Sequence, residues 1–409
     1  MARTLQVLLV SSSAELADEL NAALEAATDL RVTLRRARDF AEAGEAARAR
    51  LPDLVCTELG GDAAALGGFV TALRALALDL PFVGVTERRS GEGRDEKEVL
   101  VEALRTGFLD AFERPISSAD VRRVLPQVLA VANARETAGH VVVFHSTKGG
   151  VGKSTLSVNT ACGLAQRMPD RVLLVDASLQ LGVCAIALDL EPRTTLADAA
   201  RERERLDERL LRELAERHSS GLRVLASPRD PIDAADVNDE ALARVLAIGR
   251  RAFDFVVVDT LPVVDSAMLT LLDSADRIFL VNQGTVPDVI GAERLLQTLD
   301  QLDIGTQRRR VVLNRNTPRF SGALTAAEVG ERLGQEIDYE VPHDKRVLTG
   351  LNLGEPLALR AGSRFGWGRV IRQMVDDVIA LAGPTPPASP EVEEAKARQP
   401  EWRTADADA

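Results

Sequence analysis

Short apolar runs alternate with helix-like patterns along most of the chain, and this alternation limits the fold more than any other feature of the sequence. The runs form two series, separated at 126–139 by a stretch (PQVLAVANARETAG) in which the rhythm is lost. Strands that alternate with helices build mostly parallel sheets covered by helices on both faces. The sequence therefore predicts an α/β protein with two doubly wound domains, joined at 126–139 by a helical end plus linker.

The first series occupies residues 1–125 and contains five expected strands. They lie at 6–10, 30–34, 53–57, 81–85 and 108–112. Helical patterns follow most of them, for example AELADELNAALEAA from Ala14. Five repeats in this length predict an open, parallel sheet of the flavodoxin-like type.

The second series occupies residues 140–383 and contains several continuous apolar runs, which are typical of strands covered on both faces. Its expected strands lie at 140–146, 171–176, 222–227, 253–259, 277–282, 309–314 and 336–341. The charged segment 201–218 carries both signs of charge and is expected to form one solvated helix. A last helix is expected from about Gly368 to Leu381. The residues beyond it, 384–409, are rich in proline and acidic residues and are interpreted as a disordered tail.

The amino-acid composition disfavours several classes of protein. Aromatic residues make up 3% of the 409 residues and the formal net charge is −12, which together disfavour base-stacking domains and dedicated nucleic-acid binders. Cys56, Cys162 and Cys184 have no CxxC spacing and are interpreted as small core residues in a reducing compartment. No apolar run reaches membrane-spanning length, and the first run is too short for a signal peptide, so a cytoplasmic location is expected.

A glycine-rich loop, TKGGVGKST, follows the expected strand 140–146 and precedes a helical pattern, LSVNTACGLAQRM. Strand, loop and helix in this order are the context of a P-loop. Gly149, Gly150 and Gly152, together with Val151, would let backbone N–H groups surround phosphate oxygens at a helix N-terminus. A turn that only connects strand to helix is the plainer alternative.

Three side chains at the end of this loop have the chemistry that a nucleoside triphosphate requires. Lys153 is expected to contact the β- and γ-phosphates, and the Ser154 hydroxyl is expected to bind Mg²⁺. Thr155 is placed to bond the α-phosphate. The sequence therefore predicts a phosphate and Mg²⁺ site at this loop.

Lys148 departs from the usual P-loop pattern, which has glycine at the position of Thr147. KGGVGKST resembles the deviant Walker A loop of the ParA/MinD family of P-loop ATPases. In that family the additional lysine reaches across a dimer interface to the partner's phosphates. The resemblance implies that Lys148 and Lys153 are both catalytic, with Lys148 acting in trans on ATP. A solvated loop lysine is the plainer alternative.

The same resemblance assigns roles to two aspartates at expected strand ends. Asp176 ends RVLLVD, where the family has the carboxylate that orients the attacking water. Asp259 ends FDFVVVD, at the Walker B position, where it would hold a Mg²⁺-bound water. The family often has DxDxQ after the first of these strands, and this chain has Ser178 in place of the second acid, with Gln180 retained. Without the P-loop, each aspartate would be interpreted as a turn residue.

Contacts to the adenine base are implied at two further loops. Asn314 ends RRVVLN, at a position where the family recognises adenine with a side-chain amide. Pro342 and His343 lie in the VPHD loop after the next strand, which packs on the base in the family. His343 is equally consistent with a surface loop residue.

Residues 1–125 resemble a response-regulator receiver domain that has lost its phosphorylation chemistry. The metal-binding acids after the first strand are replaced by serines at 11–13, and the phospho-accepting aspartate is replaced by Glu58. Thr86 occupies the switch position, and Arg114–Pro115 stands where receivers have Lys–Pro. Glu58 is expected either to form a salt bridge with Arg114 or to be a simple surface acid. The domain is interpreted as a docking or dimerisation module.

The pairing of a degenerate receiver with a ParA/MinD-type ATPase resembles the CpaE/TadZ group, which acts in the assembly and polar placement of Tad-type pilus machines. The stretches 176–190, 217–228 and 352–357 are similar to that group too. The resemblance implies a slow, partner-regulated ATPase that forms an ATP-dependent homodimer. Its partners would be pilus or secretion proteins, which would recruit it to a cell pole or to the inner face of the membrane.

Other functions within the same superfamily are alternatives. A DNA-partitioning ATPase would need basic surface, and 307–315 (QRRRVVLNR) is the obvious cluster in an otherwise acidic chain. A MinD-like division-site switch would need a basic amphipathic C-terminal helix, whereas 369–383 carries Asp376 and Asp377. An iron–sulfur reductase is disfavoured because no cysteine falls in a ligand pattern. No specific nucleic-acid partner and only indirect membrane association are therefore expected.

Overall fold

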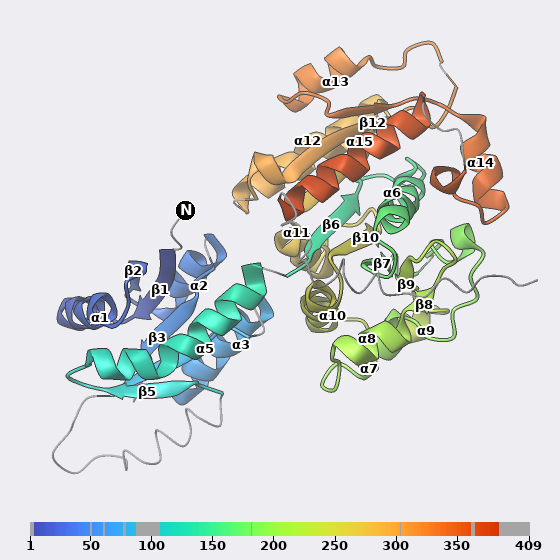
Figure 1. Ribbon diagram of the computed structural model, residues 1–409. Coiled ribbons are helices and arrows are strands. Elements are labelled where there is room, and N and C mark those ends of the chain that lie inside the picture. Colours follow the sequence, from blue (N-terminus) through green and yellow to red (C-terminus); the bar gives the residue numbers. More distant parts are fainter. Residues whose placement is uncertain are drawn as a thin grey trace, which may run out of the picture.

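The computed structural model describes residues 4–49, 51–59, 62–76, 79–86, 107–136, 138–180, 182–302, 304–318, 320–360 and 365–383. Its strands form two separate sheets (Figure 1). The predicted disordered tail at 384–409 lies outside the described residues. Among those that are described, no helix is long and apolar enough to cross a membrane.

The first sheet has five parallel strands in the order β2-β1-β3-β4-β5, the arrangement of one common doubly wound α/β fold. Its elements are β1 (Thr4–Val10), α1 (Ala14–Ala27), β2 (Arg31–Ala37), α2 (Phe40–Ala49), β3 (Leu54–Glu58), α3 (Ala63–Leu76), β4 (Phe82–Thr86), β5 (Asp110–Glu113) and α5 (Ser118–Glu136). All five predicted strands are present, and α1 has the predicted bounds. One hydrophobic cluster joins the sheet to α1 and α5, and another joins its opposite face to α2 and α3.

The second sheet has eight strands in the order β13-β12-β11-β6-β10-β7-β9-β8. They are β6 (His140–His145), β7 (Val172–Ala177), β8 (Glu216–Arg217), β9 (Arg223–Leu225), β10 (Phe255–Thr260), β11 (Arg277–Asn282), β12 (Arg309–Asn314) and β13 (Tyr339–Val341). Every pair is parallel except β8 with β9, so the prediction of a mostly parallel sheet is confirmed. The short antiparallel strand β8 was not predicted.

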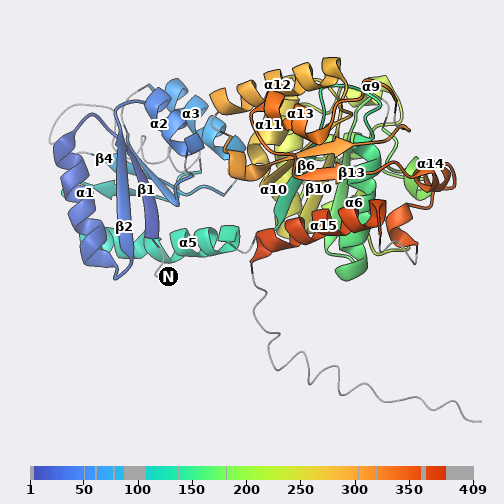
Figure 2. The ribbon, with the colours of Figure 1, turned by 90° about the horizontal axis from the view of Figure 1, so that it is seen from above.

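Helices cover both faces of this sheet (Figure 2). They are α6 (Lys153–Arg167), α7 (Leu196–Arg201), α8 (Glu208–Leu214), α9 (Pro231–Ala234), α10 (Asp239–Ala252), α11 (Ser266–Ser274), α12 (Val286–Gln301), α13 (Ala326–Leu333), α14 (Lys345–Asn352) and α15 (Trp367–Ile379). Short 3-10 turns lie at Ile186–Leu188, Thr306–Arg308, Leu357–Leu359 and Ala380–Ala382.

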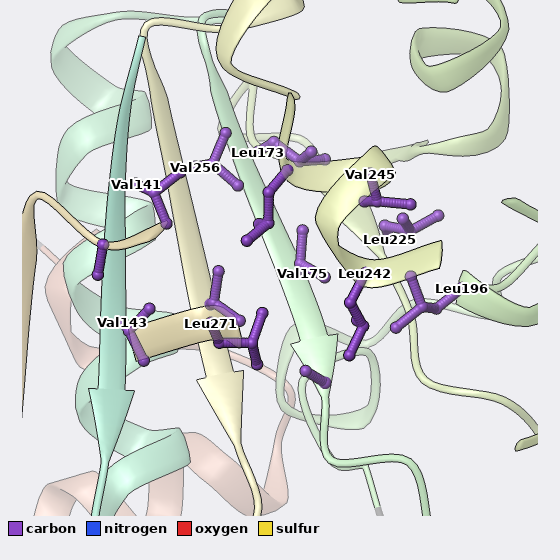
Figure 3. Close-up of a cluster of buried hydrophobic side chains, with 14 of the residues drawn as sticks. Val141, Val143, Leu173, Val175, Leu196, Leu225, Leu242, Val245, Val256 and Leu271 are labelled. Atoms are coloured by element: carbon purple, nitrogen blue, oxygen red, sulfur yellow. The ribbon is translucent and has the colours of Figure 1, made fainter. Parts of the chain in front are cut away.

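Alternate residues of the central strands point to opposite faces, which divides the core into two clusters. Val141, Val256 and Leu173 point toward α10 (Figure 3). Their neighbours Val142 and Val257 pack instead against α6 and α15. Because both faces are buried, these strands are continuous apolar runs, as predicted.

One segment folds differently from the sequence prediction. Of the single helix expected at 201–218, only 208–214 are helical, as α8, apart from Arg201, which ends α7, and β8 follows. The break has a local cause, because the Asp207 side chain accepts a hydrogen bond from the Leu210 N–H and starts a new helix there, beside a buried Leu206. The stretch 126–139, expected to be a helical end plus linker, is the second half of α5 as far as Glu136, with Pro126 inside the helix.

The expected salt bridge between Glu58 and Arg114 is replaced by other pairings. Arg114 pairs with Glu19 on α1 at 3.0 Å, and Glu58 accepts a hydrogen bond from the Ser11 hydroxyl. In the predicted receiver resemblance, Ser11 stands at the position of a metal-binding acid and Glu58 at that of the phospho-accepting aspartate, and these two side chains bond each other here. The receiver resemblance itself remains a prediction.

The last helix, α15, buries its apolar face against α6, which leaves that face unavailable to a lipid surface. Its buried residues are Trp367, Gly368, Ile371, Met374, Val375 and Val378. Elsewhere on the helix, the Asp377 carboxylate forms salt bridges with Arg277 and Arg310, each at 3.1 Å. The Asp377 side chain is 15% exposed and that of Arg277 only 8%. Asp377 therefore anchors the helix to the sheet.

We expect the Asp377→Ala substitution to lower the free energy of unfolding by about 3 kcal/mol, because it removes the counter-charge of the buried Arg277 and leaves Arg310 paired with Asp338 alone. Asp376→Ala is the matched control, since Asp376 pairs with Arg167 at 2.6 Å on the surface and should contribute less than about 1 kcal/mol. Urea unfolding followed by tryptophan fluorescence measures both, because Trp367 lies in α15. Equal losses in the two variants would contradict this account.

Candidate functional site

The glycine-rich loop joins the end of β6 to the start of α6, as a P-loop requires. Gly150 and Gly152 have φ angles of 78° and 90°, which side chains other than glycine rarely adopt. Gly152 is the N-cap of α6, so Lys153 begins the helix. A Cβ added to Gly149 or Gly150 would point into open space, so the loop backbone borders an unfilled cradle.

A cavity of about 290 Å³ lies in this cradle. Trp367 and Leu348 supply apolar walls that the sequence did not single out. The P-loop and the VPHD loop, which are far apart in the sequence, thus meet in one pocket; their roles toward a nucleotide remain predictions. The lining includes all of the predicted phosphate and base residues: Lys148, Gly149, Gly150, Val151, Gly152, Lys153, Ser154, Thr155, Asn314, Pro342 and His343.

Amide side chains from the neighbouring strand ends hold the P-loop backbone. Asn314 is buried and its Nδ2 donates to the Val151 carbonyl at 2.8 Å. Asn316 Nδ2 donates to the Gly150 carbonyl at 2.7 Å, and its Oδ1 accepts from Gln283 Nε2 at 2.7 Å. The Asn314 amide, predicted to contact adenine, is therefore already hydrogen-bonded to the P-loop backbone in this structure. Asn316 and Gln283 were missed, because nothing in their local sequence distinguishes them.

Lys153 points away from the cradle toward the sheet. Its ammonium donates to the Thr260 carbonyl and lies 3.5 Å from Asp259 Oδ1. Both side chains are almost fully buried. The adjacent His145 is neutral, because burial and the Lys153 charge lower its pKa to about 3. Lys153 must therefore leave Asp259 in order to contact a phosphate.

Asp176 and Asp259 are register partners at the ends of β7 and β10, which brings the two predicted aspartates side by side. Burial, and secondarily the neighbouring Asp259 charge, raises the pKa of Asp176 to about 7. The backbone N–H groups of Ser178 and Cys184 donate to its two oxygens at 3.1 and 3.0 Å. These two hydrogen bonds fix the Asp176 carboxylate in place. Its raised pKa lets it accept a proton near neutral pH.

Cys184 was predicted to be a small core residue, and it is free and buried like Cys56 and Cys162. Its surroundings differ, because its thiol lies beside the two aspartates, with Sγ 3.7 Å from Asp259 Oδ2. Burial first, then the charges of Asp176 and Asp259, raise the pKa of this thiol well above its ordinary value. Cys184 is therefore a neutral thiol in this structure.

Lys148 is exposed at the rim of the pocket. Its nearest recorded electrostatic neighbour is Asp288, whose carboxylate is 1% exposed at the start of α12. Burial raises the pKa of Asp288, and the Lys148 ammonium opposes that rise. The position of Lys148 leaves it free to reach outward, as the in-trans prediction requires.

The donor set fits a nucleoside triphosphate with Mg²⁺. The open glycine cradle at a helix N-terminus offers backbone N–H groups to phosphate oxygens. Asp259 Oδ1 is buried and accepts no hydrogen bond from any residue that the structure describes, and it faces the Lys153 ammonium at 3.5 Å, so this oxygen suits a cation or a bound water. Ser154, the other predicted metal residue, lies in the first turn of α6 and lines the 290 Å³ cavity, whereas Asp259 is not among the residues that line it.

The part of the chain that contains the second sheet is similar to known proteins. Residues 139–310 match a family model described as an AAA domain. MinD of Thermotoga maritima is 26% identical over 236 residues, which are 56% of this chain and 84% of that protein. The crystal structure of a ParA family ATPase from Chlorobium tepidum aligns with 25% identity and a TM-score of 0.54, over 60% of this chain and 99% of the other. The part of the chain built around β6–β13 is thus similar to ParA/MinD-family P-loop ATPases.

Other relatives agree with this assignment. MinD of Bacillus subtilis is 24% identical over 250 residues, 59% of this chain and 91% of that protein. MinD of Pyrococcus furiosus shares the fold at 19% identity, with a TM-score of 0.52 over 59% of this chain and 99% of that chain. The chain is accordingly an ATPase. MinD of Pyrococcus horikoshii, solved in complex with Mg-ADP, shares the fold at 17% identity, with a TM-score of 0.52 over 60% of this chain and 98% of that chain.

Proposed function

We propose that the protein is an ATP-dependent dimerising switch that positions a larger assembly in the cell. One arrangement carries the proposal: an exposed second lysine, Lys148, stands at the rim of a P-loop cradle whose own lysine, Lys153, is held inside against Asp259. A lysine at the rim is available to a second copy of the chain, whereas Lys153 serves its own site.

In this proposal each residue at the site has a separate task. Lys153 leaves Asp259 and binds the β- and γ-phosphates, and Lys148 contributes a positive charge to the partner's site. Asp176 orients the attacking water and accepts its proton. Ser154 and Asp259 hold Mg²⁺, which neutralises negative charge on the phosphates.

Two alternatives within the family fit the structure less well. The basic cluster expected to favour DNA is largely used inside the fold. Arg308 donates to the carbonyls of Leu272, Asp273 and Ala275; Arg309 binds Asp300 and the Ile304 carbonyl; and Arg310 pairs with Asp338 and Asp377. A direct membrane anchor is likewise disfavoured at α15, because its apolar face is buried.

The finer proposal is that the positioned assembly is a Tad-type pilus or secretion machine, as in the CpaE/TadZ group. Its support is the pairing of this ATPase domain with a five-stranded first domain in which Glu58, bonded to Ser11, stands where a receiver has its phospho-accepting aspartate. Division-site or DNA positioning is the alternative, favoured by the similarity to MinD and ParA proteins.

Light scattering with and without ATP and Mg²⁺ tests the switch directly. We expect the Asp176→Ala protein, which binds ATP without hydrolysing it, to double its molecular mass when ATP is added. The Lys148→Ala substitution in that background should abolish the doubling, because the charge that crosses the interface is lost.

Lys345→Ala is the matched control, because Lys345 is an exposed lysine at the start of α14, and its loss should leave the doubling intact. A mass that ATP does not change, in a protein that binds ATP, would overturn the proposed switch. Doubling that survives Lys148→Ala would reject the in-trans role of Lys148 alone.

A further inference from the structure

Three different ligand groups meet at the acidic end of the nucleotide site. One donor atom each from Asp176, Cys184 and Asp259 lies within 4.8 Å of the other two. All three residues are at most 1% exposed. They come from separate pieces of backbone, since Asp176 and Asp259 end neighbouring strands and Cys184 lies in the loop before the 3-10 turn at Ile186–Leu188.

We propose that Asp176, Cys184 and Asp259 form a binding site for a thiophilic divalent cation of the zinc class, which shares Asp259 with the predicted Mg²⁺ site and differs from it in its other donors.

The electrostatics of this cluster favour a cation. Two carboxylates are held in register and are removed from water, so each raises the energy of the other's ionised form. The neighbouring positive charge is Lys153, 3.5 Å from Asp259 Oδ1, an oxygen that receives no hydrogen bond from the described residues. One ammonium charge offsets at most one of the two carboxylates. A divalent ion between the carboxylates would balance both.

The thiol decides which class of cation is favoured. Mg²⁺ prefers oxygen ligands and keeps several waters, whereas zinc-class ions bind sulfur and carboxylate oxygen together, often with three protein ligands and one open position. Cys184 Sγ already faces Asp259 Oδ2 at 3.7 Å. On binding, the S–H bond breaks, a metal–sulfur bond forms, and the proton is released to solvent. No oxidation or reduction is involved.

The route to the cluster passes through the nucleotide pocket. Lys153 lines that pocket and also contacts Asp259, so the three donors lie directly behind this one side chain. Asp259 would serve both this cation and Mg²⁺, and Asp176 would be taken from the attacking water. A bound thiophilic cation is therefore expected to inhibit ATP hydrolysis, and this consequence, unlike the binding itself, rests on the proposed function.

Cadmium titration of the reduced, nucleotide-free full-length protein in excess Mg²⁺ tests the binding site. We expect a thiolate-to-cadmium charge-transfer band that saturates at one equivalent per chain and is displaced by zinc. Cys184→Ser should remove the band. Cys162→Ser should retain it, because Cys162 lies within α6 and its thiol is not one of the three clustered donors. Asp259→Asn should lower cadmium affinity by at least about tenfold with every thiol present.

A band that persists in Cys184→Ser, or no band at one equivalent in the wild-type protein, would overturn the site. Cys184→Ala, with thermal unfolding and ATP binding as checks of folding, separates a lost ligand from a damaged fold. If both Cys184 variants unfold, Asp259→Asn still decides, since an unchanged cadmium affinity in that variant rejects the site. A protein that binds cadmium at Cys184 but has no ATP-dependent doubling of mass would keep this site and reject the proposed switch.

Discussion

The Asp176→Asn protein is expected to bind ATP but to hydrolyse it at least about 100-fold more slowly than the wild type, because the amide cannot accept a proton from water. The same substitution should also change how stability depends on pH. Burial beside Asp259 raises the pKa of Asp176 to about 7 in the folded chain, whereas an aspartate in the unfolded chain has a pKa of about 3.9. The folded protein therefore holds a proton that the unfolded protein has released between these two values.

The sign of the pH effect follows from this difference. The stability that the raised pKa contributes is fully present below about pH 4 and is lost as the pH rises through about 7. The amide in the Asp176→Asn variant does not titrate, so the variant should gain on the order of 2–4 kcal/mol relative to the wild type between pH 5 and pH 8. The amide also places an NH₂ group opposite the N–H of Ser178 or Cys184, which costs stability equally at both pH values.

Urea unfolding is measured at pH 5 and at pH 8. The quantity that tests this account is the change in unfolding free energy between the two pH values, not the absolute stability at either of them. Tryptophan fluorescence does not report on the first domain, because both tryptophans, Trp367 and Trp402, lie outside it. Asp376→Asn is the matched control, since Asp376 is exposed on α15 and its loss should leave the pH dependence unchanged. Parallel pH profiles for the wild type and Asp176→Asn would show that Asp176 is ionised throughout, against this account.

The sequence was sufficient for features that depend on short-range spacing. The P-loop, its flanking strand and helix, and the aspartates that end β7 and β10 are each defined by short local patterns, and the register of neighbouring parallel strands then brings Asp176 and Asp259 together. The same regularity predicted all seven parallel strands of the second sheet. It did not predict β8, because two residues of antiparallel pairing leave no periodic pattern.

Features set by tertiary contacts were not accessible in this way. The Cys184 backbone reaches Asp176 only because the loop after β7 turns back on itself, at a place where a Cβ on Gly182 would meet an Asp176 oxygen at 2.5 Å. The clamp of Gln283 and Asn316 on Gly150 joins the loops after two different strands to the P-loop. Polar residues in such loops cannot be told apart by sequence, because their hydrogen-bond partners depend on how distant parts of the chain fold together.

The Gly152→Ala substitution is expected to abolish measurable ATP binding and to destabilise the ATPase domain by about 2–3 kcal/mol. Gly152 has a φ of 90°, where an alanine costs about 1–2 kcal/mol. Its Cβ would also lie 2.3 Å from Asn314 Nδ2, which must then release the Val151 carbonyl, at a further cost of about 1 kcal/mol. The loss of this bond moves the loop backbone that is proposed to surround the phosphates.

Gly149→Ala is the matched control, because Gly149 lies earlier in the same loop and its added Cβ would meet no atom within 4 Å. Its unfolding free energy should stay within about 0.5 kcal/mol of the wild type. Urea unfolding followed at Trp367 and titration with a fluorescent ATP analogue measure both proteins. If Gly152→Ala unfolds like Gly149→Ala and still binds the analogue, the Asn314 bond and the left-handed turn do not hold the loop. The binding geometry would then have to come from the nucleotide itself, and the cradle could not be regarded as preformed.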